Sequence, residues 1–80
     1  MRGKRVAWPE GLLAPCEYAK GPDGAWYAMT PTGHLANLAR HEITEHEDGT
    51  LTVSPSILVT PGDGSEPWHG YLTRGVWNGV

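Results

Sequence analysis

Glycine and proline interrupt this chain throughout its length. Glycine occupies 11 and proline 7 of the 80 positions, 18 in all, which is about twice the usual share of these two residues. Because proline cannot continue a helix and glycine weakens one, so many of them favour turns and short strands. A helix bundle is therefore excluded. A chain of 80 residues has room for one domain with one thin core.

The clearest hairpin pattern joins strands over 41–46 and 50–54. A two-residue loop between them would place Ile43 and Val53 on opposite faces. A three-residue loop that ends in a left-handed Gly49 pairs Ile43 with Val53, and it leaves one face apolar and the other polar. Since a sheet with one buried face requires such a division, the three-residue loop is expected.

An earlier hairpin is expected from strands over 16–20 and 25–30, joined by a turn that contains proline and glycine. Proline presets the backbone angle at the first central position of such a turn, and glycine tolerates the strained position. The expected register pairs Lys20 with Ala25.

A last hairpin is expected from strands over 68–72 and 76–80, joined by a three-residue loop that ends at Gly75. This register pairs Tyr71 with Trp77. An aromatic contact across two strands contributes about 0.5–1.5 kcal/mol beyond burial.

The remaining segments complete a mostly β fold. Residues 34–38 are expected as a strand, and a short helix over 34–40 is the alternative, although so short a helix is marginal without packing. A short buried strand is expected over 57–59, between two prolines. The chain is therefore predicted as one small antiparallel sheet of successive hairpins over 14–80. Residues 1–13 lack periodicity and are predicted as a flexible or loosely packed arm.

Charge and cysteine content narrow the possible functions. The formal net charge is −3, and the range 41–66 contains six acidic residues and no lysine or arginine. Such a surface repels phosphate, so no nucleic-acid partner is expected. Cys16 is the one cysteine of the chain and cannot form an internal disulfide, which favours the reducing cytoplasm. The apolar run at 57–59 is far too short to span a membrane, and no membrane partner is expected.

The motif at 41–46 (HEITEH) is close to a zinc-protease signature but differs in spacing. That signature needs two histidines four residues apart on a helix. Here they are five apart, on an expected strand that would point them to opposite faces. Ser54 and Ser56 lack the glycine-flanked turn of a serine nucleophile, and no glycine-rich phosphate loop precedes a helix. No catalytic constellation, enzyme activity or cofactor is expected.

A small zinc-binding domain is the alternative hypothesis. His69 together with His41 or His34 would supply imidazole ligands, which zinc accepts. No two of these residues have the close spacing of a zinc motif. Histidines with a structural role on strands are therefore the preferred interpretation.

The chain has four tryptophans and no phenylalanine. Trp26 and Trp77 are expected in the core. Tryptophan and tyrosine dominate the binding energy of protein interfaces, and a second aromatic group surrounds the last hairpin. The candidate partner-binding residues are Trp68, His69, Tyr71 and Arg74. A protein partner is therefore expected. A homodimer is a further option, because a second copy would cover the unpaired edges of a small open sheet.

Two stretches carry a resemblance to other proteins, namely 52–58 (TVSPSIL) and 68–72 (WHGYL) with the following 75–77 (GVW). Over about residues 15–80 the chain resembles small uncharacterised proteins encoded by phages and prophages of bacteria. The resemblance implies an accessory protein in the cytoplasm of the bacterial host that binds a host or phage protein, and it implies no activity. Some larger members of this group carry a Cys-His pair at the hairpin, which implies a bound metal. Here His69 matches that pair, while Trp68 stands at the cysteine position.

Overall fold

The computed structural model describes residues 1–80 and consists of strands, turns and loops, with no helix. The strands are β1 (Lys4–Arg5), β2 (Glu17–Lys20), β3 (Trp26–Met29), β4 (Leu35–Asn37), β5 (Glu42–Glu45), β6 (Leu51–Val59), β7 (Trp68–Thr73) and β8 (Val76–Gly79). They form two four-stranded sheets, ordered β1-β2-β3-β4 and β5-β6-β7-β8. The mostly β prediction is confirmed, and the short helix over 34–40 is wrong because β4 occupies this segment.

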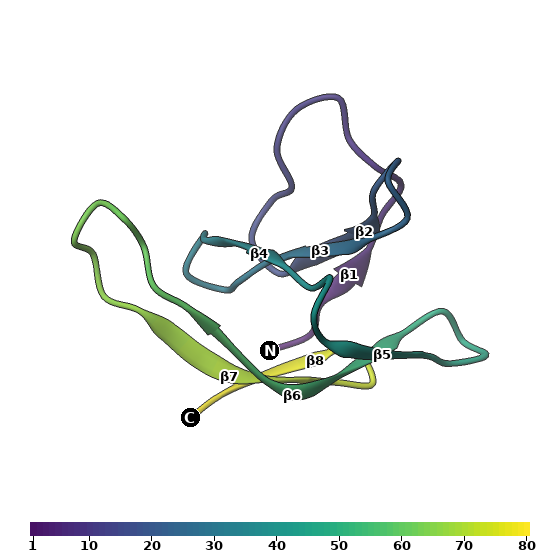
Figure 1. The fold of residues 1–80 in the computed structure, drawn as a ribbon. Helices are drawn as coiled ribbons and strands as arrows, with labels where there is room; N and C mark the ends of the chain where they lie inside the picture. Colours follow the sequence, from purple (N-terminus) through teal and green to yellow (C-terminus); the bar gives the residue numbers. More distant parts are fainter.

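The two sheets face each other, with the β1–β4 sheet above the β5–β8 sheet in Figure 1. The main core lies between them and takes side chains from both. Its ten members are Tyr18, Trp26, Ala28, Ala36, Leu38, Leu51, Val53, Ile57, Leu72 and Trp77. Trp26 and Trp77 are buried as predicted. The burial of these side chains from both sheets holds the two layers together.

Three connections share one turn geometry, in which a glycine adopts a left-handed conformation at the third loop position. These glycines are Gly24, Gly33 and Gly49, with φ of 86°, 88° and 87°. In the β5–β6 loop, the N–H of Gly49 donates to the carbonyl of His46 at 2.9 Å. Ile43 lies opposite Val53, so the register predicted for this hairpin is confirmed.

The β2–β3 hairpin differs from its predicted register by one residue. Lys20 lies opposite Trp26 and not opposite Ala25. The reason is that this loop is also of the three-residue type and starts one residue later. The N–H of Gly21 donates to the carbonyl of Ala25 at 2.7 Å. With this register, Tyr18 and Trp26 point to the same side of the sheet, into the main core.

The β7–β8 hairpin also differs from the prediction. Its loop has two residues, Arg74 and Gly75, both with positive φ (46° and 76°), as a type I′ turn requires. Leu72 therefore lies opposite Trp77, and both point inward. Tyr71 lies opposite Asn78, so the predicted aromatic contact between Tyr71 and the tryptophan of β8 is wrong.

Strand β6 is longer than expected. The sequence predicts a separate short strand over 57–59, whereas β6 runs from Leu51 to Val59. Its pairing with β7 shifts register between Val53 and Ile57, around the cis Ser54–Pro55 peptide. A bulge of this kind lets a strand pass a proline without ending.

The first six residues contact both sheets. The N–H of Trp77 donates to the carbonyl of Met1 at 2.7 Å, and the N–H of Gly3 donates to the carbonyl of Gly75 at 2.6 Å. On the other side, β1 pairs with β2 in parallel. This arrangement differs from the loosely packed arm expected over 1–13. Backbone hydrogen bonds hold the segment, and such bonds leave no periodic pattern in the sequence.

Candidate functional site

The outer surfaces of the two sheets differ in how they are covered. On the β1–β4 sheet, the loop between β1 and β2 arches over the outer surface (Figure 1). Its Leu13 is buried in a small cluster with Ala19 and Met29. On the β5–β8 sheet no segment of the chain lies over the outer surface (Figure 1). The first sheet is therefore covered on its outer side at β2 and β3, and the second sheet presents a bare face.

Exposed apolar side chains gather at one end of this bare face. Leu58, Tyr71 and Val80 are 61%, 49% and 79% exposed. Leu58 lies opposite His69 across β6 and β7, and the N–H of Val80 donates to the carbonyl of His69 at 2.8 Å. These residues form neighbouring rows on three strands. We call them the outer patch, which comprises Ser56, Leu58, His69, Tyr71, Asn78 and Val80.

Beyond the outer patch, the outward strand positions of the bare face carry mostly hydroxyl groups and almost no charge. The outward strand positions beyond the outer patch are Glu42, Thr44, Thr52, Ser54, Thr73 and Val76. Glu42, on the edge strand β5, is the one charged residue among them. The other acidic side chains of this half of the chain lie in the turns or, for Glu45, against Arg5. Depletion of charge together with exposed aromatic and aliphatic groups is typical of the centre of a protein interface.

Two histidine side chains contact Ser56, one at its hydroxyl and the other at its carbonyl oxygen. His69 Nε2 lies 2.9 Å from Ser56 Oγ, and His41 Nε2 lies 3.3 Å from the Ser56 carbonyl oxygen. His34 is not brought to them, because it follows the β3–β4 turn, where its N–H donates to Thr30 Oγ1. No group of three His, Cys, Asp or Glu side chains is placed to hold a metal ion. The zinc hypothesis therefore gains no support from the geometry.

The contact between Ser56 and His69 has the atoms of a nucleophile and its base. Catalysis of that kind also needs a third group that orients the imidazole, and donors for a developing oxyanion. The His69 ring has no hydrogen-bond partner other than Ser56. We therefore interpret the Ser56–His69 pair as a polar contact within the outer patch.

A polar cavity of about 360 Å³ lies at the other end of the same sheet, between the β5–β6 loop and the β7–β8 turn. It is lined by His46, Glu47, Asp48 and Arg74. Thr52 joins its two sides, because Thr52 Oγ1 accepts from the Arg74 N–H at 3.0 Å and lies 2.7 Å from His46 Nε2. We call it the turn cavity.

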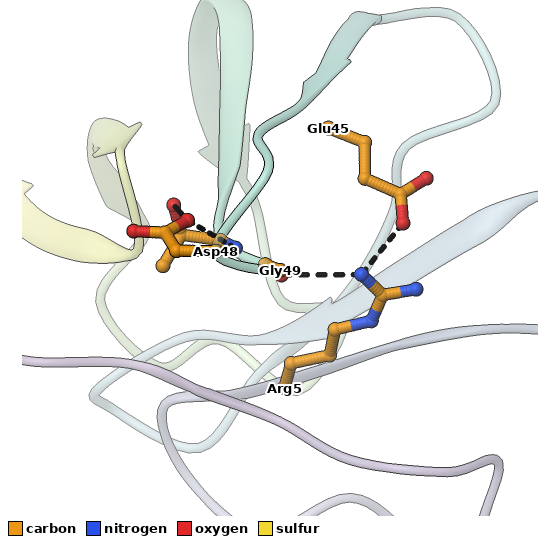
Figure 2. Close-up of polar contacts among 5 residues, drawn as sticks. Arg5, Glu45, Asp48 and Gly49 are labelled. Carbon is orange, nitrogen blue, oxygen red and sulfur yellow. Dashed lines mark hydrogen bonds and ion pairs between the residues drawn. The ribbon is translucent and has the colours of Figure 1, made fainter.

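Arg5 holds the β5–β6 loop from the side opposite to the Asp48 side chain (Figure 2). Its Nη1 donates to Glu45 Oε2 at 2.6 Å and to the Gly49 carbonyl at 3.2 Å. The guanidinium also lies 5.0 Å from the centre of the Trp26 ring, a cation–π geometry. Since β1 belongs to the first sheet, this side chain links the two sheets and fixes the loop.

Asp48 stabilises the same loop from within. Its Oδ1 accepts from the hydroxyl of Thr50 at 2.7 Å and from the N–H of Thr50 at 3.0 Å. These bonds favour the ionised carboxyl and hold the pKa of Asp48 below its ordinary value of 3.8, with smaller contributions from the charges of His46 and Arg74. The walls of the turn cavity are thus preformed by local hydrogen bonds.

The predicted partner-binding residues fall in three places. His69 and Tyr71 lie in the outer patch, and Arg74 lines the turn cavity. Trp68 points inward and packs edge-to-face on Trp77, with 5.4 Å between ring centres. Trp68 therefore belongs with the core, because the register of β7 alternates its side chains between the two faces.

Sequence reasoning missed Leu58 and Val80. It treats 57–59 as one buried run, whereas Ile57 is buried and Leu58 is mostly exposed. The available signal was the alternation of a strand, which sends Leu58 to the face opposite to Ile57 and Val59.

Comparisons of the chain with protein-family models, with curated proteins and with solved structures returned no match. No helix in the structure is long and apolar enough to cross a membrane. The functional argument therefore rests on the geometry of this chain.

Proposed function

We propose that this chain is a non-enzymatic accessory protein of phage or prophage origin that binds a protein partner through the outer patch, in the bacterial cytoplasm. The observation that carries the proposal is the unequal covering of the two sheets. The longest loop of the chain lies over the outer surface of the β1–β4 sheet, and no segment lies over the outer surface of the β5–β8 sheet (Figure 1). The free thiol of Cys16 fits a reducing compartment.

The composition of the outer patch supports protein binding. Exposed apolar groups with hydroxyl groups beside them have the composition of an interface core and its polar rim. Tyr71, about half exposed, offers a large rigid ring with a polar end, a frequent source of binding energy. Leu58 and Val80 add apolar area beside it.

The strand edges favour binding through a face over the addition of a strand. β1 and β4 have two and three residues, and β5 begins and ends with glutamate. At β8, Met1 and Arg2 already pair with Trp77 and Val76. Short, charged or covered edges are the usual protection against pairing with another chain.

Site-specific photo-crosslinking in the bacterial host tests the proposal. A benzophenone amino acid placed at position 71 is expected to give discrete cross-linked protein bands. The same group at position 12 is the matched control, because Leu12 is 83% exposed but lies in the loop that covers the other sheet. Equal cross-linking at both positions, or none at position 71, would overturn the proposal.

A second pair of variants separates binding from folding. Tyr71→Ala removes an exposed ring and is expected to lower the yield of partner cross-linked at position 58 while the melting temperature stays within about 3 °C, since exposed substitutions usually change stability by less than about 0.5 kcal/mol. Leu35→Ala, which removes an exposed leucine from β4, is expected to leave the cross-linking unchanged. A loss of cross-linking in both variants would contradict the assignment of the patch.

A further inference from the structure

We propose that a second copy of this chain covers the outer patch, so that two bare faces pack against each other in a twofold symmetric dimer. The inference rests on the proposed function, because it names the partner of the same surface. Three properties of the face favour its own copy over a different protein.

The first property is charge. The chain has a formal net charge of −3, so two copies repel each other unless their contact faces avoid the acidic groups. In a twofold contact each face meets itself, and any carboxylate near the axis opposes its own copy. The outer patch carries no carboxylate: Glu42 lies on the edge strand β5, and Glu47 and Asp48 lie at the other end of the face, in the turn cavity. A negatively charged protein that bound a different, basic partner would instead be expected to place its acidic residues on the contact face.

The second property is the kind of polar group. The face carries the hydroxyls of Thr44, Ser54 and Thr73 beside the outer patch. A hydroxyl both donates and accepts hydrogen bonds, so identical hydroxyl groups can pair with each other. Lysine or glutamate cannot pair with its own kind in this way. The hydroxyl groups beside the outer patch can therefore pair with the same groups of a second copy.

The third property is size. Four strands about 4.8 Å apart and about 20 Å long give roughly 400 Å² of sheet plane, and side-chain relief brings this close to the 600 Å² per partner of the smallest stable interfaces. Two such faces would pack about 10 Å apart, with Leu58, Tyr71 and Val80 of both copies in the contact.

Sedimentation velocity over about 1 µM to 1 mM protein, the range that a small interface requires, tests the inference on the full chain. The wild type is expected to shift from monomer to dimer. Leu58→Glu places a carboxylate in the outer patch and is expected to weaken dimerisation by at least about 30-fold. Leu35→Glu is the matched control, since Leu35 is also an exposed strand leucine, 48% exposed, but on the other sheet. It is expected to dimerise like the wild type.

A charge-exchange experiment makes the test specific for two facing copies. Leu58→Glu and Leu58→Lys are each expected to remain monomeric alone and to associate when mixed, because opposite charges then meet across the axis. Circular dichroism of each variant shows that the fold persists. Association of the mixture supports the inference, and failure of the mixture to associate contradicts it.

The failures of the two proposals are distinguishable. If the wild type stays monomeric to about 1 mM while position 71 still cross-links a different protein in the host, the dimer inference is refuted. The proposal that the outer patch binds a protein then still stands. A dimer that both Leu58→Glu and Leu35→Glu leave intact overturns the assignment of the surface itself.

Discussion

Gly70 is the position where a single added methyl group is expected to disturb the fold most. It lies in β7 on the inner side of the sheet, opposite Gly79. A Cβ at this position would overlap the backbone carbonyl oxygen of Asn78 and would lie 2.5 Å from Cη2 of Trp68. The indole of Trp68 lies over the glycine and packs edge-to-face on Trp77. Gly70→Ala is therefore expected to displace both the backbone of β8 and the Trp68–Trp77 contact in the core.

The loss of stability depends on which of the atoms near the added Cβ can move. Overpacking usually costs about 1–3 kcal/mol when side chains adjust to relieve it. Here one of the two obstacles is backbone, and the other is a ring held against Trp77, so a value of about 3 kcal/mol or more is expected. For a domain of this size, each kcal/mol lowers the melting temperature by about 4–8 °C, which gives a decrease of about 12–24 °C.

Thermal unfolding followed by tryptophan fluorescence and circular dichroism measures this effect. Gly62→Ala is the matched control, because a Cβ there would meet no atom within 4 Å and its φ is not left-handed. The control is expected to be neutral, or more stable by about 0.4–1 kcal/mol through a less flexible unfolded chain. A Gly70→Ala protein that melts within about 4 °C of the control would refute the reasoning, since the cost would then be below about 1 kcal/mol.

Three further effects are expected. Gly3→Ala would place a Cβ 2.8 Å from Trp77 Nε1 and should destabilise by about 1–3 kcal/mol in urea unfolding, whereas Gly11→Ala meets nothing and should be neutral; equal midpoints would contradict the packing of the first residues. Glu45→Gln should cost at most about 1 kcal/mol, because the pair it forms with Arg5 is well exposed, and a larger loss in the same assay would contradict that. Hydrogen bonds lower the pKa of the turn carboxylates of Asp23, Asp48 and Asp63 below 3.8. Their stabilisation is therefore present above that pH and is lost as the pH falls through the lowered values, below about pH 4; the triple Asn variant should show a shallower acid decline of the melting temperature, and an unchanged decline would be evidence against it.

The β5–β6 hairpin could be predicted from the sequence because only one of its faces is buried. Apolar Ile43 and Val53 alternate there with polar residues, so only one register separates the two faces. Gly49 then selects the loop length, since the three-residue loop needs a left-handed residue at its end. The hydrophobic pattern and the turn residue predict the same register at this hairpin, and the structure has that register.

The β2–β3 hairpin could not be predicted in the same way, since both of its faces are buried. Tyr18 points into the main core, and the adjacent Ala19 is completely buried beneath the loop between β1 and β2. Strands that are covered on both sides show no alternation of apolar and polar residues. The register then depended on the turn alone, and a shift of one residue left no trace in the hydrophobic pattern.

Trp68 lies inside and not on the predicted surface for a related reason. A one-residue shift of register moves every side chain of a strand to the other face. The β7–β8 loop was expected to have three residues and has two, which places Trp77 and not Val76 opposite Leu72. Trp77 and Trp68 therefore meet in the core, while Tyr71 stays outside.

The alternation that fails on the covered sheet is informative on the bare one. In β6 and β7 the inward set is complete without Leu58 and Tyr71, because Ile57 and Leu72 already fill the core side. An apolar residue at an outward position of such a strand does not pack into the core of its own chain. Leu58 and Tyr71 occupy outward positions on adjacent strands whose other outward residues are polar. This pattern supports the proposed contact surface and can be recognised once the register is known.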